Sequence, residues 1–140
     1  MSITDRQKQL VAETFARVGP ISDQAATMFY SRLWEIAPES KALFTETNMR
    51  QQGMKLIQTI GIAVKSLDNL DNLVPIVRDL GKRHIAYGVT REQYTIVGEA
   101  LLWTLEQALG ADFTSEVRDA WASVYGVLSS VATSAYELEQ

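Results

Sequence analysis

Apolar residues recur along most of the chain at intervals of three and four positions, which is the spacing of one face of an α-helix. The alternation of period two that indicates β-strands is found nowhere in the sequence. Turn and breaking residues interrupt the helical pattern, so that about seven helical segments are predicted. Because no heptad is sustained and no segment repeats, the pattern favours an all-α fold of orthogonally packed helices rather than a coiled coil.

Capping and breaking residues predict where these helices begin and end. The predicted starts are Thr4, Pro20, Thr47 or Asn48, Thr90 with Gln93, and Thr114 or Asp112. The predicted ends are Gly19-Pro20, Ala37-Pro38, Gly88 and Gly110. Pro38 is expected to open a short helical turn that carries Leu43 and Phe44. Asp68-Asn69 and Asp71-Asn72 predict a turn that ends before the next helix begins.

The only histidine of the chain, His84, is predicted to face the core. Leu73, Val77 and Leu80 precede it at intervals that place all four side chains on one helix face. Gly88 follows closely, so His84 is expected in the last turn of its helix. A lone histidine in this position is more often a core residue bonded to the backbone, or a cation favoured at a helix C-terminus, than a metal ligand. The spacing alone leaves these interpretations open.

Two more polar side chains lie on otherwise apolar helix faces. Tyr30 is predicted to point toward the core from the second helix. Gln52 begins an i, i+4 line that continues through Leu56, Ile60 and Val64. An amide at the head of an aliphatic stripe requires a hydrogen-bonding partner when it is buried.

Length and composition limit the possible classes of protein. The 140 residues are expected to form one domain, residues 1–140, around a single core. A net charge of -4 disfavours nucleic acid as a partner, because phosphate binding needs a basic surface. The absence of cysteine excludes disulfides, thiolate nucleophiles, iron–sulfur ligation and covalent haem attachment within this sequence.

No stretch of the sequence has the pattern of a targeting or membrane segment. The first residues, MSITDRQKQL, lack the apolar core of a signal peptide, and no segment approaches the length of apolar residues that spans a bilayer. We therefore expect a cytoplasmic protein with no membrane partner. No carboxylate pair or nucleophile–base motif supports a hydrolytic enzyme, and the sequence does not indicate an oligomeric state.

Five segments, in this order and spacing, resemble the globin family, and most closely the bacterial single-domain globins and the haem domain of flavohaemoglobins. They are FYSRLW at 29–34, Pro38 with Phe44, KLIQTIG at 55–61, HIAYGVTREQYTIVGEALL at 84–102, and DAWASVYGVL at 119–128. The resemblance covers the full length of the chain and implies a globin fold that binds haem b. A globin-like interaction module without a cofactor is disfavoured, because the residues that resemble haem contacts occur together.

The resemblance implies a set of haem contacts. His84 resembles the proximal ligand, whose imidazole binds haem iron while its other ring nitrogen bonds to a neighbouring acceptor. Phe44 resembles the phenylalanine that packs on the porphyrin, and Tyr94 the tyrosine beneath the haem on the proximal side. Leu56 would stand over the iron, although an ordinary core leucine would be buried in the same way. Arg83 would reach a haem propionate, with a solvated cation as the equal alternative.

Tyr30 and Gln52 resemble the distal pair of flavohaemoglobins and related bacterial globins. A tyrosine hydroxyl and an amide N–H in a dry pocket stabilise the partial negative charge of bound dioxygen, which implies slow oxygen release. The expected small partners are O₂, NO and CO. The leading hypothesis is a globin that binds oxygen tightly and, when reduced by a separate reductase, converts nitric oxide to nitrate. The alternative is oxygen storage, transport or sensing without turnover.

One position departs from the flavohaemoglobin pattern. Where that family places a proximal glutamate, this chain has Tyr136, and the adjacent Glu137 points about 100° away around the helix. A carboxylate at this position would push electron density toward the iron through the histidine, so we expect a weaker push in this protein. The sequence ends at Gln140 and contains no flavin or nicotinamide domain, which is why a separate reductase is expected.

Overall fold

The computed structural model describes residues 3–44, 48–86 and 88–138, and this part of the chain contains helices and no strands. The predicted all-α class is confirmed. The helices are α1 (Asp5–Val18), α2 (Ser22–Ile36), α3 (Met49–Lys65), α4 (Leu70–Ala86), α5 (Arg91–Leu109) and α6 (Ser115–Leu138), with short 3₁₀ helices η1 (Gly19–Ile21), η2 (Pro38–Phe44) and η3 (Gly110–Asp112).

Most predicted helix ends are confirmed. Capping boxes are formed by Thr4 with Gln7 and by Thr90 with Gln93, while Asn48 and Thr114 accept hydrogen bonds at the starts of α3 and α6. Gly110 follows α5 with a φ of 56°, and Gly88 follows α4 with a φ of 88°. Glycine suits both positions because these backbone angles are strained for other residues. Thr47, the alternative cap, lies outside the described residues.

Two predicted boundaries are wrong by a few residues, and the structure excludes one of the two alternative starts of α6. Pro20 lies inside the short η1 helix, which begins at Gly19, and α2 begins at Ser22. Asp112 lies in η3 and does not start α6. Asp71-Asn72 belongs to α4 and not to the preceding turn. Asp is common in turns, but its negative charge is also favoured in the first turn of a helix, and here the second effect decides.

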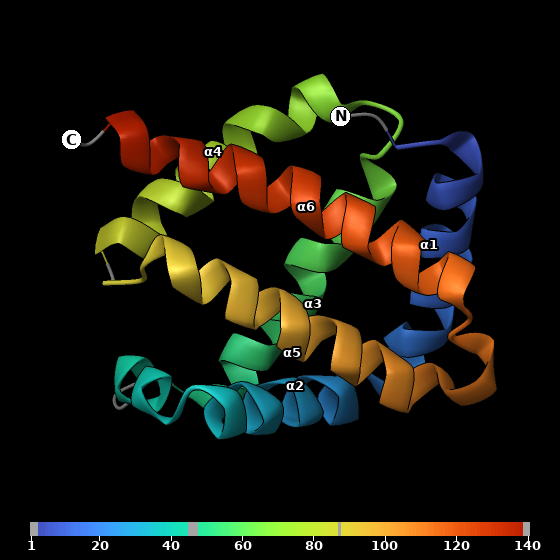
Figure 1. Cartoon of the computed structure of the whole chain (residues 1–140), viewed down its shortest axis with the longest axis horizontal. Coiled ribbons are helices and arrows are strands. Elements are labelled where there is room, and N and C mark those ends of the chain that lie inside the picture. The colour runs from blue at the N-terminus through green and yellow to red at the C-terminus, as the bar shows by residue number, and fades with distance from the viewer. Residues whose placement is uncertain (1–2, 45–47, 87, 139–140) are drawn as a thin grey trace.

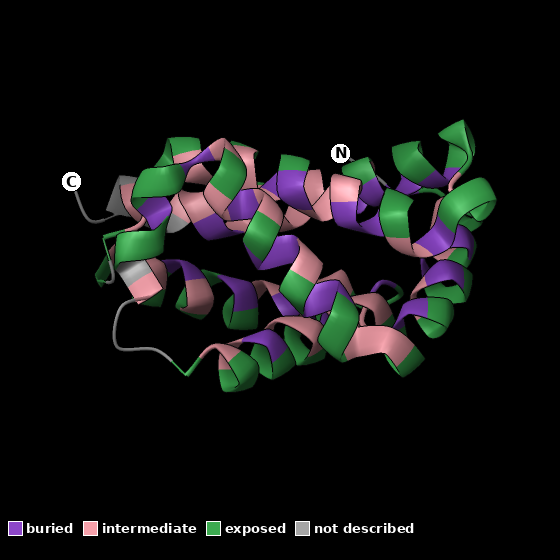
Figure 2. Ribbon diagram, turned by 90° about the horizontal axis from the view of Figure 1, so that it is seen from below, coloured by how far each residue is buried: buried purple, intermediate pink, exposed green. Residues whose placement is uncertain are grey.

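The helices pack in crossed pairs around a core (Figure 1). α4 packs mainly against α6, α2 against α5 and α3, and α1 against α6, whereas α3 and α4 are not among the closely packed pairs of the described residues. Figure 2 shows buried positions on the helix sides that face one another and exposed positions on the outer sides. No helix in the described residues is long and apolar enough to cross a membrane.

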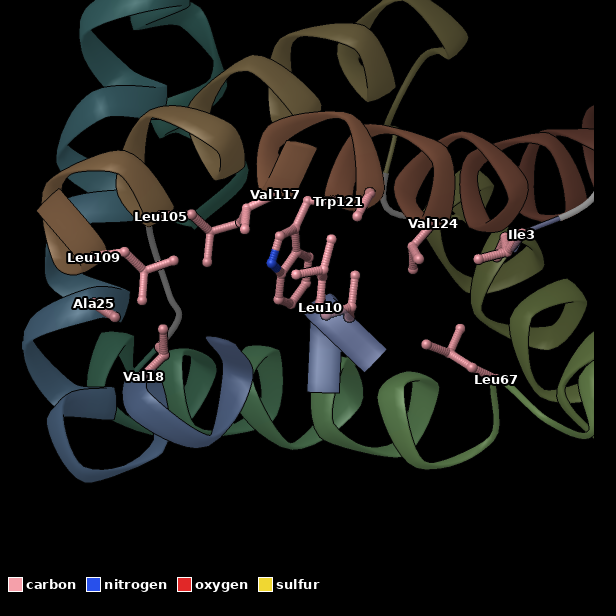
Figure 3. Close-up of a cluster of buried hydrophobic side chains, with 12 residues drawn as sticks. Ile3, Leu10, Val18, Ala25, Leu67, Leu105, Leu109, Val117, Trp121 and Val124 are labelled. Carbon is pink, nitrogen blue, oxygen red and sulfur yellow. The ribbon is translucent and has the colours of Figure 1, made fainter. Parts of the chain in front are cut away.

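The largest buried cluster lies between α1, α5 and α6 (Figure 3). Its centre is Trp121, which is 2 % exposed and donates from Nε1 to Thr14 Oγ1 at 2.8 Å. A buried indole N–H without an acceptor would destabilise the fold, so this bond allows the ring to be buried.

Two glycines allow helices to approach closely. A Cβ on Gly81 would collide with the carbonyl oxygen of Ala132, so α4 and α6 touch through backbone. A Cβ on Gly53 would lie 2.8 Å from the Cβ of Ala26, where α3 crosses α2. The first crossing lies one turn before His84, and the second is adjacent to Gln52. Both therefore position helices that carry predicted site residues.

Candidate functional site

A cavity of about 350 Å³ is enclosed mainly by α3, α4, α5 and α6. Its lining is mostly aliphatic and aromatic, as is typical of sites for small molecules and cofactors. The polar residues among its lining are Thr59, Arg83, His84, Tyr94, Tyr125 and Ser129. Of the predicted site residues, His84, Arg83, Tyr94 and Leu56 line this cavity.

His84 lies in the last turn of α4, as predicted, and is partly buried. Its Nδ1 is 2.8 Å from the carbonyl oxygen of Leu80. Because a carbonyl can only accept, Nδ1 carries the proton, and Nε2 is the nitrogen with a lone pair in the neutral ring. Burial lowers the pKa of His84, the bond to Leu80 opposes this shift, and the charge of Arg83 adds to it. The neutral form, which binds metals, is therefore favoured.

Two tyrosines adjoin the histidine. The ring of Tyr94 lies 6.2 Å from that of His84, and the ring of Tyr136 meets Tyr94 edge to face at 6.0 Å. Burial, and then the neighbouring Tyr136 hydroxyl, raise the pKa of Tyr94. The buried Tyr94 hydroxyl makes no hydrogen bond of good geometry within the described part of the chain. Tyr136 instead donates to the carbonyl of Val89 at 2.6 Å. The side chain of Glu137 lies outside the described atoms.

Arg83 is more than half exposed and also lines the cavity. Its Nε is 3.6 Å from Asp79 Oδ2, one helical turn earlier. Both side chains are more than half exposed, so this ion pair contributes little to stability. The guanidinium can therefore exchange this partner for an anionic group at the cavity mouth.

Tyr30, Gln52 and Phe44 form a second group, which the structure brings together away from the lining of the cavity. Tyr30 is 6 % exposed, and its ring meets that of Phe44 edge to face at 5.4 Å. Burial raises the pKa of the Tyr30 hydroxyl, and a hydrogen bond with Gln52 opposes the rise. The burial of Tyr30 confirms its predicted inward orientation, and its hydroxyl is the group near Gln52 that could serve as the partner of the amide.

Phe29 and Leu56 separate this second group from the cavity. Both line the cavity and both pack in the cluster that contains Tyr30. Leu56 lies one turn after Gln52 on α3, so the two side chains share a helix face. The predicted steric role of Leu56 over the cavity is therefore compatible with its position, while Tyr30 and Gln52 stand behind this wall.

Sequence reasoning did not single out several residues of the site. Tyr125 and Ser129 line the cavity from α6, and they are four residues apart on one helix face. Their common face could have been found from this spacing. Ile62 and Ile76 also line the cavity although they are 49 % and 50 % exposed, so they mark its mouth. The helical spacing of apolar residues does not show which of them lie half exposed at the mouth of a cavity.

The donor set does not resemble an all-protein metal site. No group of three or more His, Asp or Glu side chains that could hold a metal ion occurs in the described ranges, and the sequence contains no cysteine. A single imidazole on an apolar cavity fits a metal whose other ligands belong to an organic cofactor. The tautomer of His84 and the lining of the cavity therefore suit a flat apolar group that carries a metal.

Comparison with known proteins matches the chain to one family model and to several relatives of known name. The family model described as Globin matches residues 27–132. The chain is similar to neuroglobin-1 of Oncorhynchus mykiss, with 29% identity over 139 residues that cover 90% of this chain and 87% of that protein. Neuroglobin of Danio rerio is 28% identical over 144 residues, covering 94% of this chain and 91% of the relative. The flavohemoprotein of Bacillus subtilis is 32% identical over 103 residues, covering 72% of this chain and 26% of that longer relative.

Proposed function

Because the chain belongs to the globin family, whose members bind haem and small gases, we propose that it is a haem-b globin that binds dioxygen tightly and reversibly. We further propose that, with electrons from a separate reductase, it converts nitric oxide to nitrate. The observation that carries the proposal is the apolar cavity with the Nδ1-protonated imidazole of His84 on its wall.

The proximal side of the cavity suits haem. Nε2 of His84 would bind the iron, since Nδ1 is held by Leu80, and this bond also sets the orientation of the ring. Arg83 at the mouth would pair with a propionate, and Tyr94 would pack beneath the macrocycle. Non-covalent binding is proposed because the sequence offers no cysteine for a thioether link.

Bound haem would supply an iron coordination site for O₂, NO or CO. The chain would supply the polarity and access of that site. Leu56 lines the cavity and packs in the cluster that contains Tyr30, so it would limit the space available to a gas. Phe44 packs on Tyr30 at 5.4 Å and would support the distal tyrosine from behind.

Tyr30 and Gln52 would stabilise a bound gas by donating hydrogen bonds. The amide of Gln52 acts on the pKa of the Tyr30 hydroxyl, so the two groups lie near each other, and Gln52 is one helical turn from Leu56. Neither side chain lines the cavity in the structure, so both would have to move to reach a gas bound there. Each donated bond would contribute about 1 to 3 kcal/mol in a dry site and would slow gas release.

Oxygen storage, transport or sensing without turnover is the second candidate. The placement of Tyr30 and Gln52 behind the wall of Phe29 and Leu56 favours it, because donors that stay there do not retain a gas. The relatives also differ in length. The chain covers 26% of the Bacillus subtilis flavohemoprotein, so most of that relative has no counterpart in the matched region. An external reductase is proposed only as part of the first candidate, because only turnover requires electrons.

Absorption spectra test haem binding. The ferric and ferrous spectra of the purified protein are expected to show a histidine-bound haem, and His84→Ala should lose haem or change its Soret band. Phe113→Leu serves as the control, because Phe113 packs on the core cluster away from the cavity. An unchanged Soret band in His84→Ala would overturn the proposal.

Gas kinetics separate the two candidates. Tight binding predicts slow dissociation of oxygen, and dioxygenation predicts rapid consumption of nitric oxide with formation of nitrate by the reduced, oxygenated protein. Fast oxygen release with negligible consumption of nitric oxide would favour transport or sensing.

A further inference from the structure

Helices α3 and α4 carry a large share of the positive charge of an acidic chain. They contain six of the 13 Lys and Arg residues but only two of the 17 Asp and Glu residues. The two carboxylates are Asp71 and Asp79 of α4, so α3 has none. The six cations are all exposed, and they are Arg50, Lys55, Lys65, Arg78, Lys82 and Arg83. The two helices that form the cavity mouth are therefore basic, although the net charge of the chain is -4.

Ion pairs increase this contrast between the two helices and the rest of the chain. Four cations outside α3 and α4 have carboxylate partners, in the pairs Arg6–Glu116, Lys8–Asp68, Arg17–Asp112 and Arg32–Glu35. Within the described ranges, the only ion pair of a cation on α3 or α4 is Arg83–Asp79. Exposed cations that no carboxylate neutralises create a positive potential, which attracts an anionic surface.

Three of the unneutralised cations lie beside the cavity mouth or just outside it. Lys55 is two helical turns before the mouth residue Ile62, so both lie on one side of α3. Lys82 adjoins Arg83, which lines the cavity, and Arg78 is one turn before Lys82 on the outer side of α4. We call Lys55, Arg78 and Lys82 the basic rim.

The same two helices carry the most exposed large hydrophobic side chains of the described residues. Met54, Ile62 and Ile76 are about half exposed, and all three belong to α3 or α4. Ile62 and Ile76 also line the cavity. Protein interfaces commonly have an apolar centre surrounded by a polar and charged border. The cavity mouth and the basic rim together have this composition.

We propose that the cavity mouth and the basic rim form the docking surface for an acidic protein that donates electrons. The inference rests on the proposed function, in which haem occupies the cavity and an external reductase supplies electrons. Docking at the mouth brings the donor close to the haem. In this step the donor protein loses one electron and the ferric iron gains it, while no covalent bond forms or breaks. Arg83 is not counted in the rim, because the proposed function assigns it to a propionate.

An anionic membrane is the other surface that a basic face attracts. Helices that lie on a membrane bury a continuous apolar face in the lipid. The apolar face of α3 is not available for this, because Leu56, Ile60 and Val64 line the cavity. The few exposed apolar side chains at the mouth suit a protein interface better than insertion into lipid.

Charge reversal in the haem-loaded full chain tests the proposal. The probe is reduced flavodoxin, a small acidic flavoprotein, and stopped-flow absorbance follows reduction of the ferric protein at several salt concentrations. The rim variants are Lys55→Glu and Lys82→Glu. Arg118→Glu is the matched control with the same change in net charge, because Arg118 is exposed on α6 and does not line the cavity. The methyl viologen radical, a small cationic reductant, shows whether the iron stays equally reducible.

We expect each rim variant to lower the second-order rate constant with flavodoxin about threefold to tenfold at low salt, because the attraction that steers the two proteins together is weakened. The wild-type rate should fall as salt rises, since salt screens exposed charges. The rim variants should depend less on salt. Arg118→Glu should keep a rate close to that of the wild type, and methyl viologen should reduce all variants without slowing.

An NMR titration with oxidised flavodoxin maps the contact without a redox reaction. Amide signals of residues 55–62 and 76–83 are expected to shift, and those around residue 118 are not. Cosedimentation with phosphatidylglycerol vesicles tests the membrane. Vesicle binding that the rim variants abolish, with unchanged rates for flavodoxin, would overturn the proposal in favour of a membrane site.

Equal flavodoxin rates in the wild type, the rim variants and Arg118→Glu would also overturn the proposal, and the haem spectrum would remain that of a histidine-bound iron. A spectrum that does not depend on His84 would overturn both the proposed function and the role in electron donation. The NMR contact map does not require bound haem, so it still shows in that case whether an acidic protein docks on the rim. The two failures are therefore distinguishable.

Discussion

In the second group of site residues, the direction of the buried Tyr30 hydroxyl when a gas is bound decides the role of this side chain. Tyr30 is nearly fully buried and hydrogen-bonds with Gln52 behind Phe29 and Leu56. A tyrosine in this place either turns into the cavity when a gas binds or stays where it packs. The strength of gas retention distinguishes these two outcomes.

Tyr30→Phe is expected to accelerate oxygen dissociation about fivefold to 150-fold, because a hydrogen bond of about 1 to 3 kcal/mol to the bound gas is lost. Stopped-flow measurement of oxygen release from the haem-loaded protein checks this. Thr104→Val is the control, since Thr104 is a buried hydroxyl that bonds to the carbonyl of Ala100 and does not line the main cavity. Equal release rates in wild type and Tyr30→Phe would show that the hydroxyl does not reach the gas.

The residues that the sequence located best are those whose position depends on local spacing. Thr4, Asn48 and Thr90 cap helices as predicted, because capping needs only a few neighbouring residues. The position of His84 in the last turn of α4 follows from the same kind of local rule. Asp71 was misplaced because turns and helix starts favour the same residue.

The helices position the site through contacts between helix pairs, and the sequence does not reveal where these pairs cross. The separation of Tyr30 from the cavity depends on how Phe29 of α2 and Leu56 of α3 meet, which no single helix encodes. Likewise, the tie from Tyr136 to Val89 joins residues 47 positions apart. Such contacts depend on the angle between helices, and hydrophobic periodicity gives only the face of each.

Gly81→Ala is expected to destabilise the protein by about 1 to 3 kcal/mol, because the added methyl would collide with the backbone of Ala132 and force α4 away from α6. Denaturant unfolding measures the change, and the Soret band reports any displacement of His84. Gly126→Ala is the matched control. Nothing lies near an added Cβ there, so it should be neutral or stabilise the helix by up to about 1 kcal/mol. Equal stabilities of the two variants would contradict the close crossing.

The whole molecule carries several buried phenols, and these link its stability to pH. Burial raises the pKa of Tyr30, Tyr94 and Tyr125 above the usual value of 10.0. In the unfolded chain the same groups ionise near that value. The folded state therefore binds more protons at alkaline pH, and the free energy of unfolding falls as the pH rises above 10.0.

Stability is thus expected to be fully present below pH 10.0, where both states are protonated, and to fall progressively above it. Urea unfolding at a series of alkaline pH values measures the slope. Tyr125→Phe should reduce this slope, because burial raises the pKa of this phenol. A slope that does not change in Tyr125→Phe would indicate that this phenol ionises equally in both states.

Ile62 and Ile76, half exposed at the mouth of the cavity, have a consequence for biosynthesis. Before a cofactor binds, a newly made chain exposes hydrophobic side chains at the mouth of an apolar cavity. Exposed hydrophobic surface promotes self-association. Under the proposed function, haem bound in the cavity would contact these lining residues. Cells short of haem should therefore accumulate the chain in aggregates, which makes the yield of dispersed protein a measure of haem supply.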